Sequence, residues 1–289
     1  MEIGIGLPAT IPWAKPSLNV AWAKRAEERG FSSLGIIDRI AYPNLEPLVT
    51  LAAAAAVTQR IRLMTTVLIA PTRRTGILAK QAASIDALSG GRLTLGLGIG
   101  GREDDFQDAP APFKNRGKRF EAQLVALKQI WAGNPLPGAR VPIGPKPVQP
   151  GGPPILLGGY SPSALERVGR FADGFISGGT APDFARQLYS LAEQSWQAAG
   201  RPGKPRFVTS LYFGLGPDAA EEAANYIRDY YSFMGPAAEN MARAIPSTPA
   251  ALKAAIQGFE AIGADELIMW PCIPELDQVD LAADIAKMP

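Results

Sequence analysis

Residues 61–101 read IRLMTTVLIAPTRRTGILAKQAASIDALSGGRLTLGLGIGG, and this stretch decides the fold class. The run Ile61–Ile69 is almost continuously apolar, which indicates a strand buried on both faces, as in a parallel sheet. A helical pattern follows at 76–88, and a second strand is predicted at Leu93–Leu97. Strand, crossover helix and strand form one β-α-β unit, from which α/β domains with parallel sheets are built.

The same alternation extends from this unit towards both ends of the chain. Further strands are predicted at 3–7, 34–38, 155–157, 174–176, 207–213 and 267–270. Further helices are predicted at 18–29, 48–56, 117–131, 162–171, 182–199, 219–231, 250–262 and 279–287. Eight strands that alternate with helices predict a single (β/α)8 TIM barrel with loop insertions, spanning residues 1–289.

The passage 133–154 is rich in proline and glycine and interrupts this alternation. A linker between two domains would have a similar composition. Because strands and helices continue to alternate after the passage, we favour a surface excursion within one domain.

The chain contains no histidine and one cysteine, Cys272. This excludes Ser-His-Asp triads, Cys-His pairs, His-ligated zinc or iron, intrachain disulfides and Cys-rich zinc sites. No metal site is therefore predicted. The chemistry must come from carboxylates, arginine and lysine, hydroxyls and backbone groups, or from a bound organic cofactor.

The formal net charge is +2, and no basic run of five or more residues occurs. Nucleic-acid binding needs concentrated positive charge, so we expect no nucleic-acid partner. The longest apolar run, Leu48–Val57, is shorter than the roughly 20 residues that span a bilayer, and no signal-peptide pattern follows Met1. We therefore expect a cytoplasmic protein that does not associate with membranes.

Active sites of such barrels are built from the loops after the strands, which directs the search to the strand ends. Asp38 and Arg39 end the second strand, where they either pair with each other or provide an acid and a base. The run 65–67 (TTV) in the third strand is a second candidate segment, although these residues are also ordinary β-formers. Alternating glycines at 96–101 remove side chains from one face of the fourth strand, so a flat group can approach the backbone. They form neither a P-loop nor a dinucleotide fingerprint.

The segment 158–163 reads GGYSPS and leads from a strand into a helix. Exposed N–H groups at such a helix start, together with Ser161 and Ser163, can bind a phosphate. The same residues also fit a capped helix that binds nothing. The charged loop 102–106 and the cations beyond it fit a solvated rim as well as a binding surface.

Four motifs in combination resemble the bacterial luciferase-like family of flavin and deazaflavin enzymes. They are AKQAASIDALSGGRLTLGLGIGG at 79–101, Phe113–Gly117, the segment 153–163 and ADG at 172–174. The resemblance spans nearly the whole chain. It implies a (β/α)8 barrel that binds reduced FMN, or the 5-deazaflavin coenzyme F-420, at the carboxyl ends of the strands.

The resemblance also implies roles for individual residues. In many members a non-prolyl cis peptide in the third strand supports the flavin ring, and here it would fall at Thr66–Val67. The segment 158–161 matches the phosphate loop, Gly178 matches a loop near the cofactor tail, and Asp38 matches an acidic residue near the ring. The implied cofactor-binding set is Asp38, Thr66, Val67, Gly98, Ile99, Gly158, Gly159, Tyr160, Ser161, Ser163 and Gly178.

Two departures from the family pattern concern the predicted chemistry. Many members carry an acid–histidine pair after the second strand, whereas here the second position is Arg39. Arginine stays protonated and cannot act as a general base, but it can stabilise a flavin anion or a developing oxyanion. Asp38 and Arg39 are therefore the predicted catalytic residues, with Asp38 the candidate for proton transfer. Ile99 stands where luciferase-type members place a phosphate-binding arginine, and Arg102 is the nearest replacement.

We therefore expect an oxidoreductase, namely a reduced-FMN-dependent monooxygenase of a small organic substrate. No nicotinamide fingerprint occurs, so a separate flavin reductase is the expected partner that supplies reduced FMN. Hydride transfer to or from the deazaflavin coenzyme is the alternative reaction. A non-catalytic flavin-binding protein, suggested by the missing histidine, is a third possibility. The resemblance implies a homodimer, and aromatic loop residues suggest a partly hydrophobic substrate pocket; these are Trp13, Phe106, Phe113 and Phe233.

Overall fold

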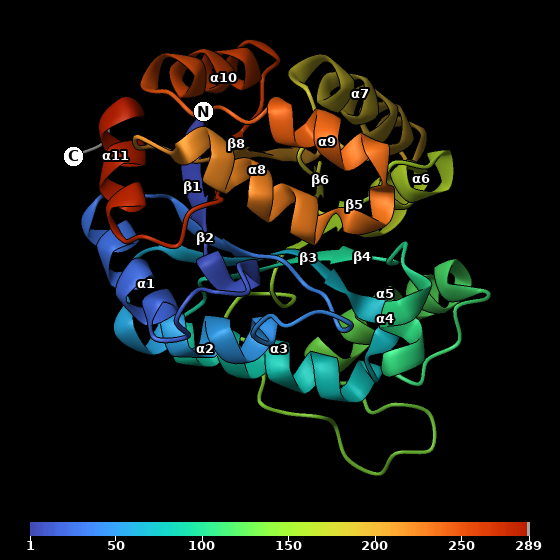
Figure 1. Ribbon diagram of the computed structural model, residues 1–289. Coiled ribbons are helices and arrows are strands. Elements are labelled where there is room, and N and C mark those ends of the chain that lie inside the picture. The colour runs from blue at the N-terminus through green and yellow to red at the C-terminus, as the bar shows by residue number, and fades with distance from the viewer. Residues whose placement is uncertain (288–289) are drawn as a thin grey trace.

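Eight parallel strands form a closed barrel in the computed structural model, which describes residues 1–287 (Figure 1). In chain order the strands are β1 (Glu2–Gly6), β2 (Ser33–Ile36), β3 (Arg62–Ile69), β4 (Leu93–Gly98), β5 (Ile155–Gly158), β6 (Gly174–Ile176), β7 (Arg206–Phe213) and β8 (Glu266–Pro271). Each strand pairs with the next, and β8 closes the barrel on β1. The predicted TIM barrel is confirmed, while residues 288–289 of the predicted domain lie outside the described residues.

An outer layer of helices covers the barrel (Figure 1). The predicted helices are all present, with bounds that agree within two residues. They are α1 (Leu18–Glu28), α2 (Pro47–Val57), α3 (Thr75–Ser89), α5 (Arg116–Trp131), α6 (Pro162–Phe171), α7 (Pro182–Ala198), α8 (Ala219–Tyr230), α10 (Pro249–Ala261) and α11 (Asp277–Ile285). Short 3-10 turns lie at Pro8–Thr10, Ala70–Thr72 and Ser232–Met234.

Two further helices lie in segments that the sequence pattern indicated as loops. The helix α4 (Glu103–Asp108) follows β4 and begins with three acidic residues, which interact favourably with a helix N-terminus. The helix α9 (Pro236–Arg243) follows α8 in a long insertion between β7 and α10, and it buries Ala238 and Ala242. Neither segment repeats large apolar residues over several turns, so the periodicity that predicted the other helices is missing here.

The interior of the barrel is filled by side chains. Met64, Leu156, Ile176, Val208, Ile268 and Trp270 belong to one buried cluster. Trp270 occupies space that glycines of β1 and β2 leave open, because a Cβ on Gly6 would lie 2.1 Å from its ring and one on Gly35 would lie 3.2 Å from it. A ligand site therefore has to lie at one end of the barrel.

The amino-terminal end of the barrel is closed by a buried polar network. Glu266 is fully buried, and its Oε1 accepts a hydrogen bond from Ser33 Oγ at 2.6 Å. Its Oε2 accepts one from Arg206 Nη2, also at 2.6 Å. Since this end is closed by contacts within the chain, the carboxyl ends of the strands remain for a ligand.

The proline- and glycine-rich passage after α5 returns to pack against α3. Asp86 of α3 is fully buried, and its Oδ2 accepts hydrogen bonds from the backbone nitrogens of Val148 (2.7 Å) and Gln149 (3.0 Å). Its Oδ1 accepts a third bond from Gln149 Nε2 at 2.7 Å. In Figure 1 the passage forms a loop that projects beyond the helical layer. The motif aspartate at position 86 therefore anchors this excursion to the barrel.

Arg92, in the glycine-rich motif before β4, also has a structural role. Its guanidinium donates to the backbone oxygens of Ala55 (3.1 Å), Thr58 (2.9 Å) and Ile61 (2.8 Å). These carbonyls lie at and beyond the end of α2, where helices leave acceptors without partners and favour a positive charge. The side chain therefore ties α2 to β3 and β4.

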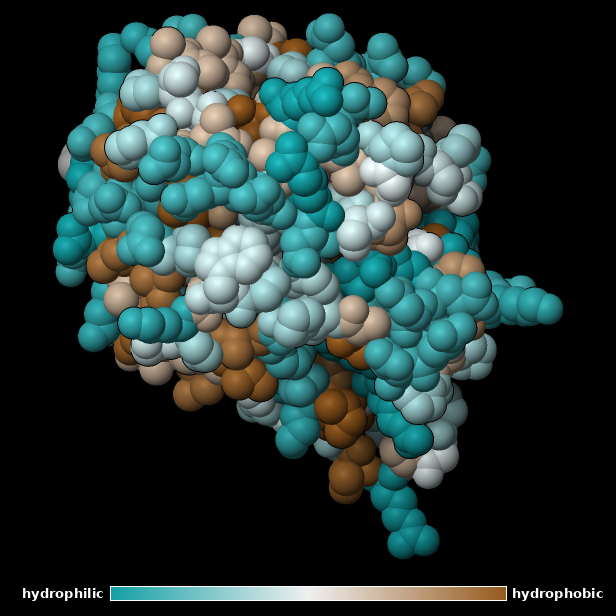
Figure 2. Space-filling view, in the orientation of Figure 1, coloured by the Kyte–Doolittle hydropathy of each residue, from teal (hydrophilic) through white to brown (hydrophobic). Residues whose placement is uncertain are grey.

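The exposed apolar residues do not form one large patch. The most exposed of them are Leu88 of α3, Val141 of the proline- and glycine-rich passage and Val49 of α2. The face in Figure 2 shows small apolar patches between hydrophilic residues. Within residues 1–287 no helix has the length and apolar character that crossing a membrane requires.

The anchoring role of Asp86 can be tested with Asp86→Ala. The substitution removes the buried acceptor of three hydrogen bonds from residues 148 and 149, and we expect it to lower the free energy of unfolding by about 2–4 kcal/mol. Trypsin should also cleave after the exposed Arg140 faster than in the wild type. Lys80→Ala is the matched control on α3, since it removes one exposed bond to Gly144 O and should change both measurements little. Equal cleavage rates in the two variants would contradict the anchoring role.

Candidate active site

A cavity of about 500 Å³, here called the mouth cavity, lies at the carboxyl ends of β2 to β6. Of the twelve residues predicted as catalytic or cofactor-binding, every one except Ser163 lines it. Asp105 and Arg116 also line it, and they come from the charged segment whose sequence fitted a solvated rim as well as a binding surface. Ser177 lines it too, although no sequence pattern indicated this residue. Within residues 1–287, no group of three or more acidic or cysteine side chains is arranged to hold a metal ion.

Asp38 follows β2, and its carboxylate is fully occupied by donors from the loop after β3. Its Oδ2 accepts hydrogen bonds from Ile69 N (2.8 Å) and Arg73 Nη1 (2.6 Å), and its Oδ1 accepts one from Arg73 Nη2 (3.0 Å). Burial raises the pKa of Asp38, while the charge of Arg73 and the bonds from Arg73 and Ile69 oppose this rise. Its predicted role in proton transfer stays a prediction, since these contacts by themselves make it an anchor for Arg73.

Arg39, the residue after Asp38, is held by a different partner. Its Nε donates to Oδ1 (3.2 Å) and Oδ2 (3.0 Å) of Asp105, a buried residue of α4. Its Nη2 donates to Ala41 O at 3.1 Å. The Nη1 atom is buried and has no hydrogen-bond partner, although the arginine side chain is only 5% exposed. A permanent positive charge with an unused donor therefore lines the mouth cavity.

Asp105 also fixes the backbone that carries Arg39. Its Oδ1 accepts hydrogen bonds from Ile40 N at 2.7 Å and Ala41 N at 2.8 Å. The neighbouring Asp104 is half-exposed, pairs with Arg102, and approaches Arg39 Nη2 only at 3.4 Å. In the sequence Asp104 and Asp105 belong to one charged loop and look alike. The only signal that Asp105 faces inward is the apolar residue next to it, Phe106, which is buried.

The predicted non-prolyl cis peptide is present between Thr66 and Val67, where the pairing of β3 with β4 shifts in register. The glycines of the neighbouring strands make room for the Val67 side chain. A Cβ on Gly98 or on Gly158 would lie 2.9 Å from a Val67 methyl group. The wall of the cavity at this point is therefore backbone and one small apolar side chain, as a flat ligand requires.

The predicted phosphate loop, which leads into α6, also lines the cavity. Ser161 is the N-cap residue, and its Oγ accepts a hydrogen bond from Ala164 N at 3.3 Å. Ser163 Oγ lies 3.2 Å from Ser161 Oγ on the exposed side and does not line the mouth cavity. The Tyr160 hydroxyl lies against Gly178, where a Cβ would be 2.3 Å from it. A larger residue at position 178 would therefore require the Tyr160 side chain to shift.

Two arginines stand at the rim of the mouth cavity, and each stacks on an aromatic ring. The Arg102 Cζ lies 3.9 Å from the ring centre of Phe233, and its Nη2 donates to Asp104 Oδ2 at 2.7 Å. The Arg116 Cζ lies 3.8 Å from the ring centre of Phe113, and its Nε donates to Gly100 O at 2.9 Å. Ile99, which stands where luciferase-type members place a phosphate-binding arginine, lines the same cavity as Arg102 and Arg116. The phosphate-binding role of Arg102 stays a prediction.

Comparison with known proteins places this geometry among oxidoreductases. An uncharacterized protein of Mycobacterium tuberculosis is 33% identical over 62% of this chain and 71% of its own length. The F420-dependent glucose-6-phosphate dehydrogenase of Beutenbergia cavernae is 32% identical over 72% of this chain and 65% of its own length. In fold, a monooxygenase from Streptomyces bottropensis superimposes with a TM-score of 0.77 at 22% identity, covering 100% of this chain and 97% of that one.

The sequence model of the luciferase-like monooxygenase family matches residues 1–266. The cis peptide at Thr66–Val67 and the glycine-lined mouth cavity lie where the resemblance to that family implied. The chain is therefore an enzyme of the luciferase-like monooxygenase family.

Proposed function

We propose that the mouth cavity binds a reduced flavin, with reduced FMN as first choice, and that the enzyme oxygenates a small organic substrate. The observation that carries this proposal is the buried, unpartnered Nη1 of Arg39 beside a wall of glycine backbone. A buried donor without an acceptor is costly, so it indicates a ligand that supplies an acceptor or a negative charge. The anionic ring of a reduced flavin meets this requirement.

The residues of the mouth cavity fit the parts of such a cofactor. Val67 and the glycines around it would hold the ring, and Arg39 would face its polar edge. The backbone N–H groups at the start of α6, with Ser161, would hold the phosphate. When bound, the reduced cofactor supplies the electrons for the reaction. The chain supplies position and a fixed positive charge, which stabilises negative charge on the ring.

The deazaflavin coenzyme is the second candidate for the same cavity. The similarity to the F420-dependent glucose-6-phosphate dehydrogenase of Beutenbergia cavernae favours this alternative. Reduced FMN would be delivered by a separate flavin reductase, whereas the deazaflavin enzyme would transfer hydride without oxygen. The two reactions therefore differ in the use of O2.

Cofactor titration separates these reactions. We expect the protein without cofactor to bind reduced FMN more tightly than the reduced deazaflavin, and the FMN complex to consume O2 when a substrate is present. Binding of the deazaflavin with no affinity for FMN would contradict the FMN proposal. Binding of FMN with no turnover of any kind would instead support a non-catalytic flavin-binding protein.

The role of Arg39 is tested by the reduction potential of the bound cofactor. Arg39→Gln removes a positive charge beside the ring, so the reduced anion loses stabilisation and the potential should become more negative. A tenfold loss of preference for the reduced form corresponds to about 30 mV for a two-electron couple, and we expect a shift of at least this size.

Asp105→Asn removes the negative charge that compensates Arg39, so the reduced anion gains stabilisation and the potential should shift in the opposite direction, to a less negative value. The neighbouring Asp104→Asn is the matched control and should leave the potential within about 10 mV of the wild type, a small fraction of a tenfold change. A potential that is unchanged in both Arg39→Gln and Asp105→Asn would show that the guanidinium does not act on the cofactor.

Asp38→Asn tests the pair at the base of the cavity. Removing one partner of a buried ion pair leaves the Arg73 charge poorly compensated, and we expect a loss of about 3–5 kcal/mol in the free energy of unfolding. Glu46→Gln is the control, because Glu46 pairs with Arg73 at 3.2 Å from a half-exposed position and should cost less than about 1 kcal/mol. If folded Asp38→Asn keeps full turnover, Asp38 takes no part in proton transfer.

A further inference from the structure

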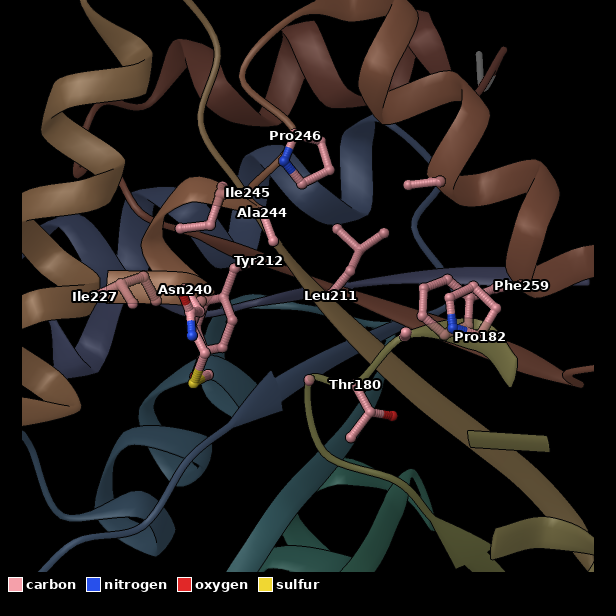
Figure 3. Close-up of a pocket in the computed structure, with 14 residues that line it drawn as sticks. Thr180, Pro182, Leu211, Tyr212, Ile227, Asn240, Ala244, Ile245, Pro246 and Phe259 are labelled. Atoms are coloured by element: carbon pink, nitrogen blue, oxygen red, sulfur yellow. The ribbon is translucent and has the colours of Figure 1, made fainter. Parts of the chain in front are cut away.

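A second cavity, here called the side pocket, lies next to the mouth cavity. Its volume is about 470 Å³, which is within the range of small-molecule sites. Its walls come from the loop after β6, from β7, from the α8–α9 insertion and from α10. Figure 3 shows the lining side chains around an open centre, with Pro246 and Ile245 on one side and Thr180 on the other.

The walls of the side pocket carry no charge. Every residue of the chain from 1 to 287 that lines it is apolar or neutral, and Leu211, Ile227 and Phe259 provide large apolar surfaces. Among the polar atoms, Thr180 Oγ1 is buried without a hydrogen-bond partner. The Tyr212 hydroxyl is already bonded to that of Tyr231 at 2.9 Å. The pocket is therefore largely apolar, and Asn240 adds a neutral amide to its lining.

The side pocket and the mouth cavity adjoin at two consecutive glycines. Gly178 lines the mouth cavity, and the next residue, Gly179, lines the side pocket. Neither has a side chain, and no larger residue fits freely at position 179, where a Cβ would lie 3.2 Å from the Tyr212 ring. A ligand in the side pocket would thus lie next to the proposed cofactor.

We infer that the side pocket binds the substrate, and that this substrate is a neutral, largely apolar organic molecule. This inference rests on the proposed function, because the cofactor must occupy the mouth cavity. A phosphate or carboxylate in the side pocket would lose its hydration without gaining a counterion, which is strongly unfavourable. Sugar phosphates and organic acids are therefore excluded from this pocket.

The charge selectivity is tested with two fluorescent probes that share one aromatic body. N-phenyl-1-naphthylamine is neutral, and 8-anilinonaphthalene-1-sulfonate carries a sulfonate. Titrated against the full chain without cofactor, the neutral probe should bind saturably and at least tenfold more tightly than the sulfonate. Equal affinities, or tighter binding of the sulfonate, would overturn the inferred substrate class.

The location is tested with two adjacent alanines of α10. Ala255 lines the side pocket, whereas Ala254 is exposed and does not. Ala255→Phe should fill the pocket and weaken binding of the neutral probe at least tenfold, and Ala254→Phe should leave it unchanged. Ala244→Phe, from the end of the insertion, provides a second filling variant if Ala255→Phe does not fold. Unchanged probe binding in a folded filling variant would overturn the assignment.

The same variants distinguish this inference from the proposed function. Affinity for FMN or deazaflavin should be unchanged in Ala255→Phe, because the cofactor occupies the mouth cavity. A tenfold loss of cofactor affinity would show that the two cavities form one cofactor site and would overturn the inference. If neither cofactor binds the wild type while the neutral probe does, the proposed function fails and the ligand class of the side pocket stands.

Discussion

Two adjacent residues of opposite charge are buried at the end of β2, and the pairing they require organises the mouth of the barrel. Asp38 binds Arg73 from the loop after β3, while Arg39 binds Asp105 from α4 after β4. A buried charge without a partner is expensive, so each pair holds its loop in place. Three consecutive loops are thereby fixed against one another. The two ion pairs therefore help to set the shape of the cavity between these loops.

The pairing also shows what the sequence could predict and what it could not. Alternating apolar runs predicted every strand, since burial on both faces leaves a local signature. The partners of Asp38 and Arg39 lie 35 and 66 residues away in the chain, and no local pattern reports such contacts. From the sequence alone, Asp38 and Arg39 could equally well have paired with each other. Asp105 was likewise indistinguishable from a solvated rim residue, because a short helix leaves little periodicity.

Much of the motif that predicted the family turns out to hold the scaffold together. Asp86 anchors an excursion, Arg92 ties α2 to the sheet, and Asp173 accepts a hydrogen bond from Ile155 N at 2.8 Å. None of these side chains lines the mouth cavity. This explains why the resemblance predicted the barrel and the cis peptide well, yet left the cofactor open between FMN and deazaflavin. The motif residues that do line the cavity, at 98–101 and 158–161, are mostly glycines and contribute backbone, which carries little information about the identity of the ring.

The site lacks a histidine, and the polar side chains that stand around it are poor substitutes for one in proton exchange. The residue after Asp38 is Arg39, and a guanidinium offers hydrogen-bond donors but no acceptor. Burial raises the pKa of Tyr231 to about 12 and that of Tyr212 above its usual value, so neither hydroxyl loses its proton near neutrality. Asp38 has both oxygens bonded to Arg73. The groups around the two cavities therefore offer fixed charge and hydrogen bonds more readily than proton exchange. Such a site suits chemistry in which the cofactor provides the reactivity and the protein provides position, electrostatic stabilisation and an apolar pocket.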